Sequence, residues 1–149
     1  MSTELWKSIS RIDGVKNVGV EVERVNEEAP GIGDYNGFSF DYRDVTFESS
    51  QIRAPRITVN KIQVSFVFPT FKKQDKAKLY AAINSFNKNN ITMKAVLGGV
   101  ARDTFEVTFS AEFMCPDTAI VDEMTHPIIK VLRNSGTLLV NLLGGMALR

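Results

Sequence analysis

The sequence predicts a single α+β domain in which an antiparallel sheet of about five to six strands is flanked by three helices. Two observations predict this fold class. Several segments alternate apolar and polar residues with the period of a strand, and three others repeat apolar residues at helical spacing. These segments do not follow one another as regular β-α-β units, so antiparallel pairing with helices on one face is expected. The 149 residues match one domain, with residues 144–149 as a loose tail.

Three segments have the apolar stripe of an amphipathic helix, and capping residues lie at their ends: Thr3 to Gly14, Asp75 to Asn90, and Asp117 to Ser135. Pro127 lies inside the third stripe and is expected to kink or split that helix. Residues 137–143 are apolar on both sides, which fits either a short helix or a last strand.

Alternation with the period of a strand occurs in five segments: 18–23, 38–43, 57–69, 91–97 and 103–113. Val45 and Phe47 are expected to continue the second segment after a bulge, and residues 24–36 and 48–56 are expected to be loops. The apolar phase of the third segment flips at Asn60-Lys61, which predicts a tight turn or a bulge there. The last two segments predict a hairpin that turns at Gly98-Gly99.

Composition and charge exclude several classes of protein. The net charge of +1 argues against a nucleic-acid binder and against a polybasic membrane surface, because both need surplus basic residues. The single cysteine rules out an intramolecular disulfide. No secretory signal and no apolar run of membrane-spanning length is visible, so a cytoplasmic location is expected.

No catalytic constellation is visible among the residues that carry chemistry. His126 is the only histidine, which argues against a multi-histidine metal site and a histidine-based triad. Cys115 lies among apolar residues and is interpreted as a small buried group rather than a nucleophile. The paired glutamates fall on the polar phase of strands, and no glycine pattern matches a phosphate-binding loop. We therefore expect no enzymatic activity, no metal and no cofactor.

Apolar residues outside the main core phase are candidates for a partner surface. Val67 and Val96 are out of phase with the apolar residues of their strands, so they would be exposed if helices cover only one face. Ile128 and Leu132 belong to the third helix, whose proline and apolar extension make it a second candidate surface. The alternative is that all four residues belong to the core.

The order of elements over most of the chain is similar to that of a known fold group. A Phe- and Val-rich strand precedes the helix LYAAINSFNKNN (Leu79–Asn90), which is followed by the strand ITMKAVL, a turn, a long alternating strand and a final helix. This succession resembles the YbjN-like proteins and the type III secretion chaperones, and Asn84, Asn87 and Lys94 stand where that group has its Asn-x-x-Asn segment and a basic strand residue. The resemblance implies a small α+β protein, often dimeric, that binds other proteins.

These expectations favour a non-enzymatic protein-binding or chaperone-like module that acts on a protein partner or by self-association, as a homodimer. Two alternatives stay open. One is a small-ligand-binding domain with its pocket between the sheet and the C-terminal helix. The other is a structural subunit of a phage or secretion assembly.

Overall fold

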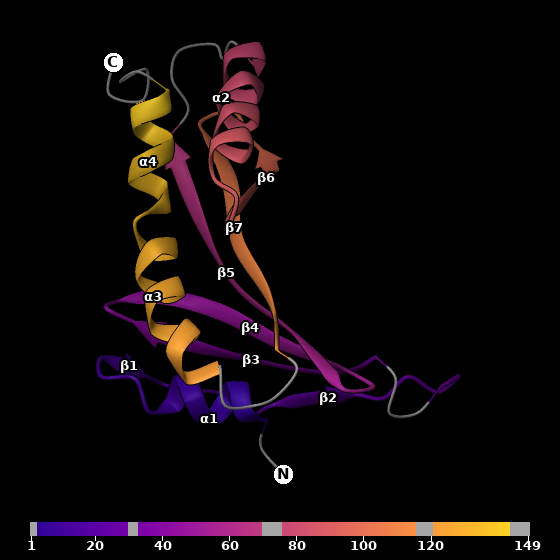
Figure 1. The fold of residues 1–149 in the computed structure, drawn as a ribbon. Helices are drawn as coiled ribbons and strands as arrows, with labels where there is room; N and C mark the ends of the chain where they lie inside the picture. Colours follow the sequence, from indigo (N-terminus) through magenta and orange to yellow (C-terminus); the bar gives the residue numbers. More distant parts are fainter. Residues whose placement is uncertain (1–2, 30–32, 70–75, 116–120, 144–149) are drawn as a thin grey trace.

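A computed structural model describes residues 3–29, 33–69, 76–115 and 121–143 (Figure 1). Within these ranges the elements are α1 (Glu4–Ser10), β1 (Val15–Lys16), β2 (Val22–Arg24), β3 (Asp34–Tyr42), β4 (Val45–Ala54), β5 (Ile57–Pro69), α2 (Lys76–Asn89), β6 (Lys94–Val100), β7 (Thr104–Cys115), α3 (Val121–Arg133) and α4 (Ser135–Leu142). The fold is α+β, as the sequence predicts, with seven strands and four helices in the described residues. The predicted tail and the predicted starts of the second and third helices lie outside these ranges.

One antiparallel sheet contains all the strands of the described residues, in the order β1-β3-β4-β5-β7-β6, and β2 pairs with β3. The two longest strands lie in its centre, where β5 pairs with β7 from Thr58↔Cys115 to Pro69↔Thr104. β6 is the edge strand beside β7 and is shorter than β7. Part of β7 therefore has no strand paired with it on that side in the described residues. The candidate site described below results from this difference.

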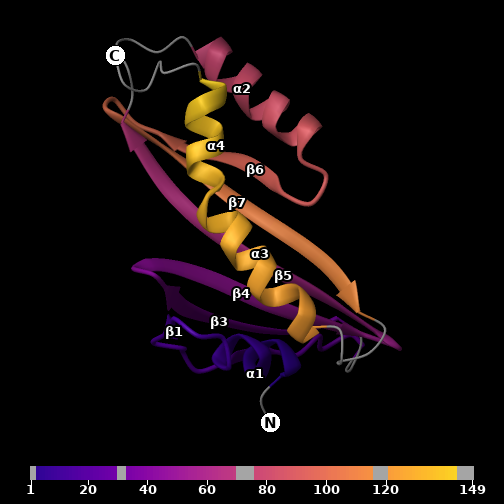
Figure 2. The same ribbon diagram turned by 60° about the vertical axis from the view of Figure 1, so that its left-hand side comes forward.

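The helices of the described chain pack on one face of the sheet. α3 and α4 follow one another along β5 and β7, α1 lies at the β1–β3 end, and α2 lies beside β6 (Figures 1 and 2). Ring contacts place α2 and α3 on the same face, since Phe86 of α2 packs on Phe109 and His126 of α3 packs on Tyr42. The opposite face of the sheet has no helix over it in the described ranges.

Alternate strand residues on the covered face form the core. A row of apolar side chains crosses five strands of the sheet: Phe40, Phe47, Val64, Phe109 and Ala95. All five are buried. Burial of each large apolar side chain contributes roughly 1.5–3 kcal/mol, so this row and its neighbours fix the position of the helices above them.

The first helix forms as predicted, but the strand predicted after it does not. The Thr3 hydroxyl caps α1 by accepting the Trp6 N–H (3.2 Å), and the Trp6 indole donates to the Gly19 carbonyl (2.9 Å). The expected half-buried strand over 18–23 is replaced by the short edge strands β1 and β2, with Val20 88% exposed. The alternation failed as a predictor because this segment lies at the sheet edge, where Val18 packs against the core but Val20 and Val22 are exposed.

A hairpin replaces the bulge and the loop predicted over residues 45–56. Arg43 and Asp44 both have positive φ values, 47° and 64°, as the two central residues of a tight turn between β3 and β4 require. Residues 45–54 form β4, so the prediction of a loop over 48–56 was wrong for most of its length. The inward positions of this strand include Ser49 and Gln51, and these buried polar residues hid the alternation.

β5 runs without a turn or a bulge through Asn60-Lys61, so the predicted interruption there is wrong. Asn60 occupies an inward position and is fully buried, and its Oδ1 accepts a hydrogen bond from Gln51 Nε2 (2.7 Å). A buried amide pair thus stands where the alternation would place apolar residues. The apparent change of phase comes from this pair and not from the backbone.

Two further predictions in the second half are corrected. The β6–β7 connection falls at residues 101–103, whereas Gly98-Gly99 lies at a register shift inside β6. Pro127 does not interrupt α3. The helix instead ends before Asn134, whose side chain donates a hydrogen bond to the Lys130 carbonyl (3.1 Å). Residues 137–142 belong to helix α4 (Ser135–Leu142), so of the two alternatives for this segment the short helix is correct.

Candidate functional site

The candidate site is the free edge of β7, which we define as Ala111–Cys115. β6 begins at Lys94, opposite Ser110, so β7 extends five residues beyond its partner on this side. On its other side the segment stays paired with β5, from Ile62↔Ala111 to Thr58↔Cys115. In the described part of the chain, no strand pairs with the free edge.

The side-chain amide of Asn87 shows which way the backbone groups of β6 and β7 point. Asn87 Oδ1 accepts the Ala95 N–H (2.6 Å) and Asn87 Nδ2 donates to the Ala95 carbonyl (2.9 Å). Both backbone groups of Ala95 therefore point away from β7, and by the alternation of a strand those of Lys94 point toward it. Lys94 and Ser110 then form a hydrogen-bonded pair.

The same alternation orients the backbone of the free edge. If Ser110 faces β6, then Glu112 and Met114 direct their N–H and C=O groups to that side, where β6 is absent. Contacts on the other side agree, because Asn60 Nδ2 donates to the Phe113 carbonyl (3.5 Å) and Thr58 Oγ1 to the Cys115 carbonyl (3.4 Å). The free edge thus presents four backbone groups for which the described residues supply no partner.

The end of α2 fixes where β6 begins. Asn90 Nδ2 donates to the Phe86 carbonyl (2.8 Å) and closes the helix, while Asn87 holds β6 from outside. The chain between them crosses from helix to strand with Met93 buried and Ile91 99% exposed. The helix end and the first residues of β6 are thus held close together, and the crossing between them leaves β7 unpaired beyond Ser110 in the described residues.

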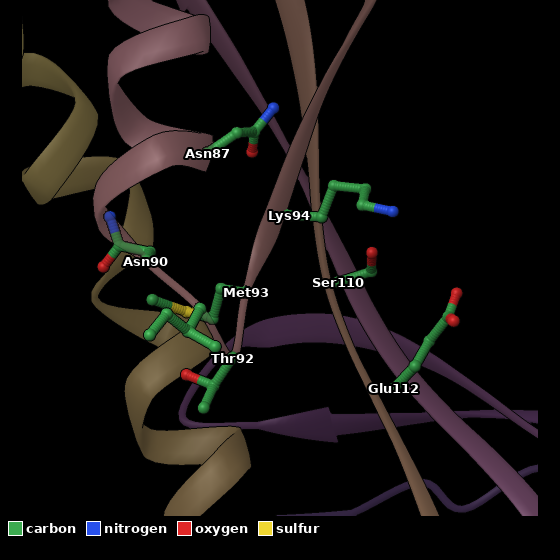
Figure 3. A pocket seen from close by; sticks show the side chains of 8 residues that line it. Asn87, Asn90, Thr92, Met93, Lys94, Ser110 and Glu112 are labelled. Atoms are coloured by element: carbon green, nitrogen blue, oxygen red, sulfur yellow. The ribbon is translucent and has the colours of Figure 1, made fainter.

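Two hollows flank the free edge. The polar hollow has a volume of about 270 Å³ and is lined by side chains that include Asn87, Lys94, Ser110 and Glu112. Figure 3 shows the last three projecting to one side of β6 and β7, while Met93 lies on the side of the helices. The apolar pocket, of about 140 Å³, lies between β7 and α3 and is lined by Thr92, Met93, Ala111, Pro127, Ile128 and Val131. The hollows share Thr92 and Met93, so they adjoin.

The size of the apolar pocket indicates what it can hold. Sites for small molecules and cofactors usually measure roughly 300–1,000 Å³, more than twice this volume. A cavity of about 150 Å³ accepts one benzene ring. The pocket therefore fits a single apolar side chain better than a ligand of cofactor size.

Exposed apolar side chains lie around the free edge. Met114 is 65% exposed on the free edge itself, Val131 is 43% exposed at the apolar pocket, and Ile91 borders the polar hollow. Isolated exposed apolar residues are common on protein surfaces, but several gathered around one strand edge are typical of a contact surface.

The charges near the free edge are few and solvated. Glu112 is exposed on the free edge, with Lys61 opposite it on β5 and Lys94 one pair away on β6. In the described residues no salt bridge joins Glu112 to either lysine. Its carboxylate is therefore available to a charged group that approaches from the free edge.

The four residues predicted for a partner surface lie in different places. Val67 and Val96 are 64% and 53% exposed on the uncovered face of the sheet, as their phase indicated. Ile128 is half-buried and lines the apolar pocket, whereas Leu132 is fully buried in the core and reaches no surface. The structure does not bring these residues together, and their role in binding stays a prediction.

Cys115 and His126 show no catalytic arrangement. The Cys115 side chain is fully buried, and burial raises the pKa of its thiol. The His126 ring packs edge-on against Tyr42, with centroids 6.1 Å apart, and its buried Nε2 has no hydrogen-bond partner in the described residues. No hydrogen bond joins the two residues within those ranges.

No group of three or more residues that could hold a metal ion occurs in the described ranges. No helix in these ranges is long and apolar enough to cross a bilayer. The absence of an enzyme site from the whole protein stays a prediction.

Comparisons with known proteins add a likeness of fold. No family model matches the sequence, and no curated protein matches it. Among solved structures the fold is similar to that of YbjN, a candidate transcription regulator from E. coli, with a TM-score of 0.40 and 10% sequence identity. The match covers 72% of this chain and 74% of YbjN. It confirms the weak YbjN-like resemblance of the sequence, and no residue role is transferred from it.

The free edge was missed by sequence reasoning. The alternation in 91–97 and 103–113 predicted two paired strands but not where their pairing stops. The alternation held no signal for it, because the predicted strand begins at Ile91, which the register Lys94↔Ser110 would place opposite Phe113, the end of the other predicted strand. The structure instead begins β6 at Lys94, so residues 91–93 were wrongly predicted as strand.

Proposed function

We propose that this protein is a non-enzymatic protein-binding module that receives an extended segment of another polypeptide at the free edge of β7. The observation that carries the proposal is the set of outward N–H and C=O groups at Glu112 and Met114, between two hollows. An extended peptide that pairs with an open sheet edge is a known mode of recognition, in which backbone hydrogen bonds give affinity and pockets give specificity.

The energetics suit a modest, reversible interaction. Four backbone hydrogen bonds at about 0.5–1.5 kcal/mol each offset part of the cost of ordering a short peptide. One apolar side chain in the apolar pocket adds at most roughly 1.5–3 kcal/mol. Binding then depends on the edge and the pocket together.

The small-ligand alternative is less well supported by the geometry. The apolar pocket does lie between the sheet and the C-terminal helices, where that alternative expected it. Its volume of about 140 Å³ is small for a cofactor, and among the described residues that line it Thr92 alone has a polar side chain. Self-association as a homodimer stays a prediction, and it would use the same free edge if a second copy supplied the added strand.

A blocked edge tests the proposal. Glu112→Pro removes the outward N–H of residue 112 and places the proline ring in the path of an added strand, while Glu112→Ala removes only the carboxylate. Binding of labelled pentapeptides with extended, alternating sequences would be followed by fluorescence anisotropy, and folding by circular dichroism. We expect the proline variant to lose binding and the alanine variant to keep most of it. A folded proline variant that binds like the wild type would refute strand addition at this edge.

A further inference from the structure

We infer, on the basis of the proposed strand addition, that the bound segment carries an apolar residue followed directly by a basic residue and runs antiparallel to β7. Three features of the free edge lead to this pattern: the direction of its backbone groups, the single apolar pocket and the charge of Glu112.

The backbone sets which face each peptide residue occupies. A residue paired with Glu112 across the free edge exchanges both backbone hydrogen bonds with it, and its side chain lies on the same face as Glu112. Its neighbour, opposite Phe113, points to the covered face of the sheet. The apolar pocket lies on that face, lined by Met93 and by Ala111 two residues along β7, so this neighbour reaches the pocket from one side. The position opposite Ala111 is taken by the buried Met93, which directly precedes β6, so the bound segment ends at the residue opposite Glu112.

The order of the two peptide residues follows from the strand direction. Every pair in the described sheet is antiparallel, and antiparallel pairing is the more stable form per residue. In an antiparallel segment the residue opposite Phe113 comes before the residue opposite Glu112. The apolar residue therefore precedes the basic one in the sequence of the partner.

The charges favour a basic residue opposite Glu112. Opposite charges directly across from one another stabilise a strand pair, and like charges destabilise it, so an acidic residue there would face the Glu112 carboxylate. Lys94 lies one pair along the sheet and Lys61 lies on the far side of Glu112, so both are more distant from the added residue than Glu112 is. The apolar pocket, which has no charged side chain in its lining, excludes the basic residue from the other position.

Four C-terminally amidated pentapeptides, each ending at the position opposite Glu112, test the pattern: Thr-Thr-Thr-Val-Lys, the same peptide with Glu for Lys, the same peptide with Ser for Val, and the order-swapped Thr-Thr-Thr-Lys-Val. Each would be titrated to about 5 mM into the full-length, ¹⁵N-labelled protein, and the Glu112 and Met114 amide signals followed, because a short peptide is expected to bind weakly. We expect the first peptide to bind about fivefold tighter than the glutamate form. The serine form is expected to bind about tenfold more weakly, and the swapped form more weakly than the first.

Two protein variants separate the contribution of the Glu112 charge to peptide binding from that of the apolar pocket. Glu112→Gln is expected to reduce the preference for lysine over glutamate to less than about twofold. Val131→Asp, at an exposed position of the apolar pocket, is expected to remove the preference for valine over serine and to leave the charge preference unchanged.

The outcomes distinguish this inference from the function on which it rests. Equal binding of all four peptides, or tighter binding of the swapped form, would overturn the pattern and leave strand addition standing. No shift of either amide with any peptide would overturn both. A dimer whose Glu112 and Met114 amides are already protected would identify a second copy as the occupant and would also overturn the peptide pattern.

Discussion

Asn87→Ala is the substitution whose effect follows most directly from the structure. The Asn87 amide makes two hydrogen bonds with Ala95, at 2.6 and 2.9 Å, and they join α2 to the outer side of β6. Alanine at position 87 leaves the N–H and C=O of Ala95 without these partners, and Ala95 is only 2% exposed. At about 0.5–1.5 kcal/mol for each bond, we expect the variant to lose roughly 1–3 kcal/mol of unfolding free energy.

Asn84→Ala is the matched control. Asn84 lies one turn earlier on α2 with its side chain exposed, so its substitution changes helix propensity in the same way without breaking a contact to β6. Urea unfolding of both variants, followed by circular dichroism, isolates the two hydrogen bonds as the difference between them. With a slope of about 2 kcal/mol per molar urea, a 2 kcal/mol difference moves the midpoint by about 1 M. Equal midpoints for the two variants would refute the role of Asn87.

Three further predictions concern the free edge, the thiol and the surface charges. Ala111→Pro should lower the free energy of unfolding by about 3 kcal/mol or more, because the Ala111 N–H faces β5, whereas Glu112→Pro should lower it far less. Equal losses in urea unfolding would contradict the assigned backbone direction. Cys115 should resist thiol reagents until the protein unfolds, since it is buried and its thiol pKa is raised; rapid labelling in native buffer would show otherwise. The hydrogen bond from Arg11 (2.6 Å) lowers the pKa of Asp122 below its ordinary value of 3.8. Its contribution to stability is therefore present above about pH 4 and lost as the pH falls through the folded-state pKa. Because both side chains are more than half exposed, Asp122→Asn should cost less than about 1 kcal/mol at pH 7 and flatten the loss of stability in acid; an unchanged profile would argue against the pair.

The sequence predicts the parts of the fold in which inward positions are apolar. β7 alternates Phe105, Val107 and Phe109 inward with polar residues outward, and both this strand and α2 form where the pattern places them. The same reasoning fails at Ser49, Gln51 and Asn60, where inward positions are polar. Gln51 and Asn60 bond to each other across two strands, whereas the buried Ser49 hydroxyl has no hydrogen-bond partner among the described residues. No single-sequence pattern distinguishes such a buried pair from a loop or a break.

The candidate site lay outside the reach of pattern reasoning for a different reason. Alternation indicates that a segment is a strand, but the free edge exists because β6 stops at Lys94 while β7 continues to Cys115. The start of β6 lies beside the end of α2, to which Asn87 ties Ala95, and this is a contact between elements that no strand pattern contains. The exposed valines at 67 and 96 followed from phase alone, whereas the buried Leu132 required knowledge of how α3 packs.

Hydrogen exchange along β7 tests the free edge most directly. In the free protein we predict slow exchange at the Ala111 and Phe113 amides, which face β5, and fast exchange at Glu112 and Met114, which face the side that β6 leaves open. Addition of the amidated peptide Thr-Thr-Thr-Val-Lys should slow exchange at Glu112 and Met114 and leave the other two amides unchanged. Uniform protection of all four amides in a free monomer, or no added protection with peptide bound, would contradict the proposed strand addition.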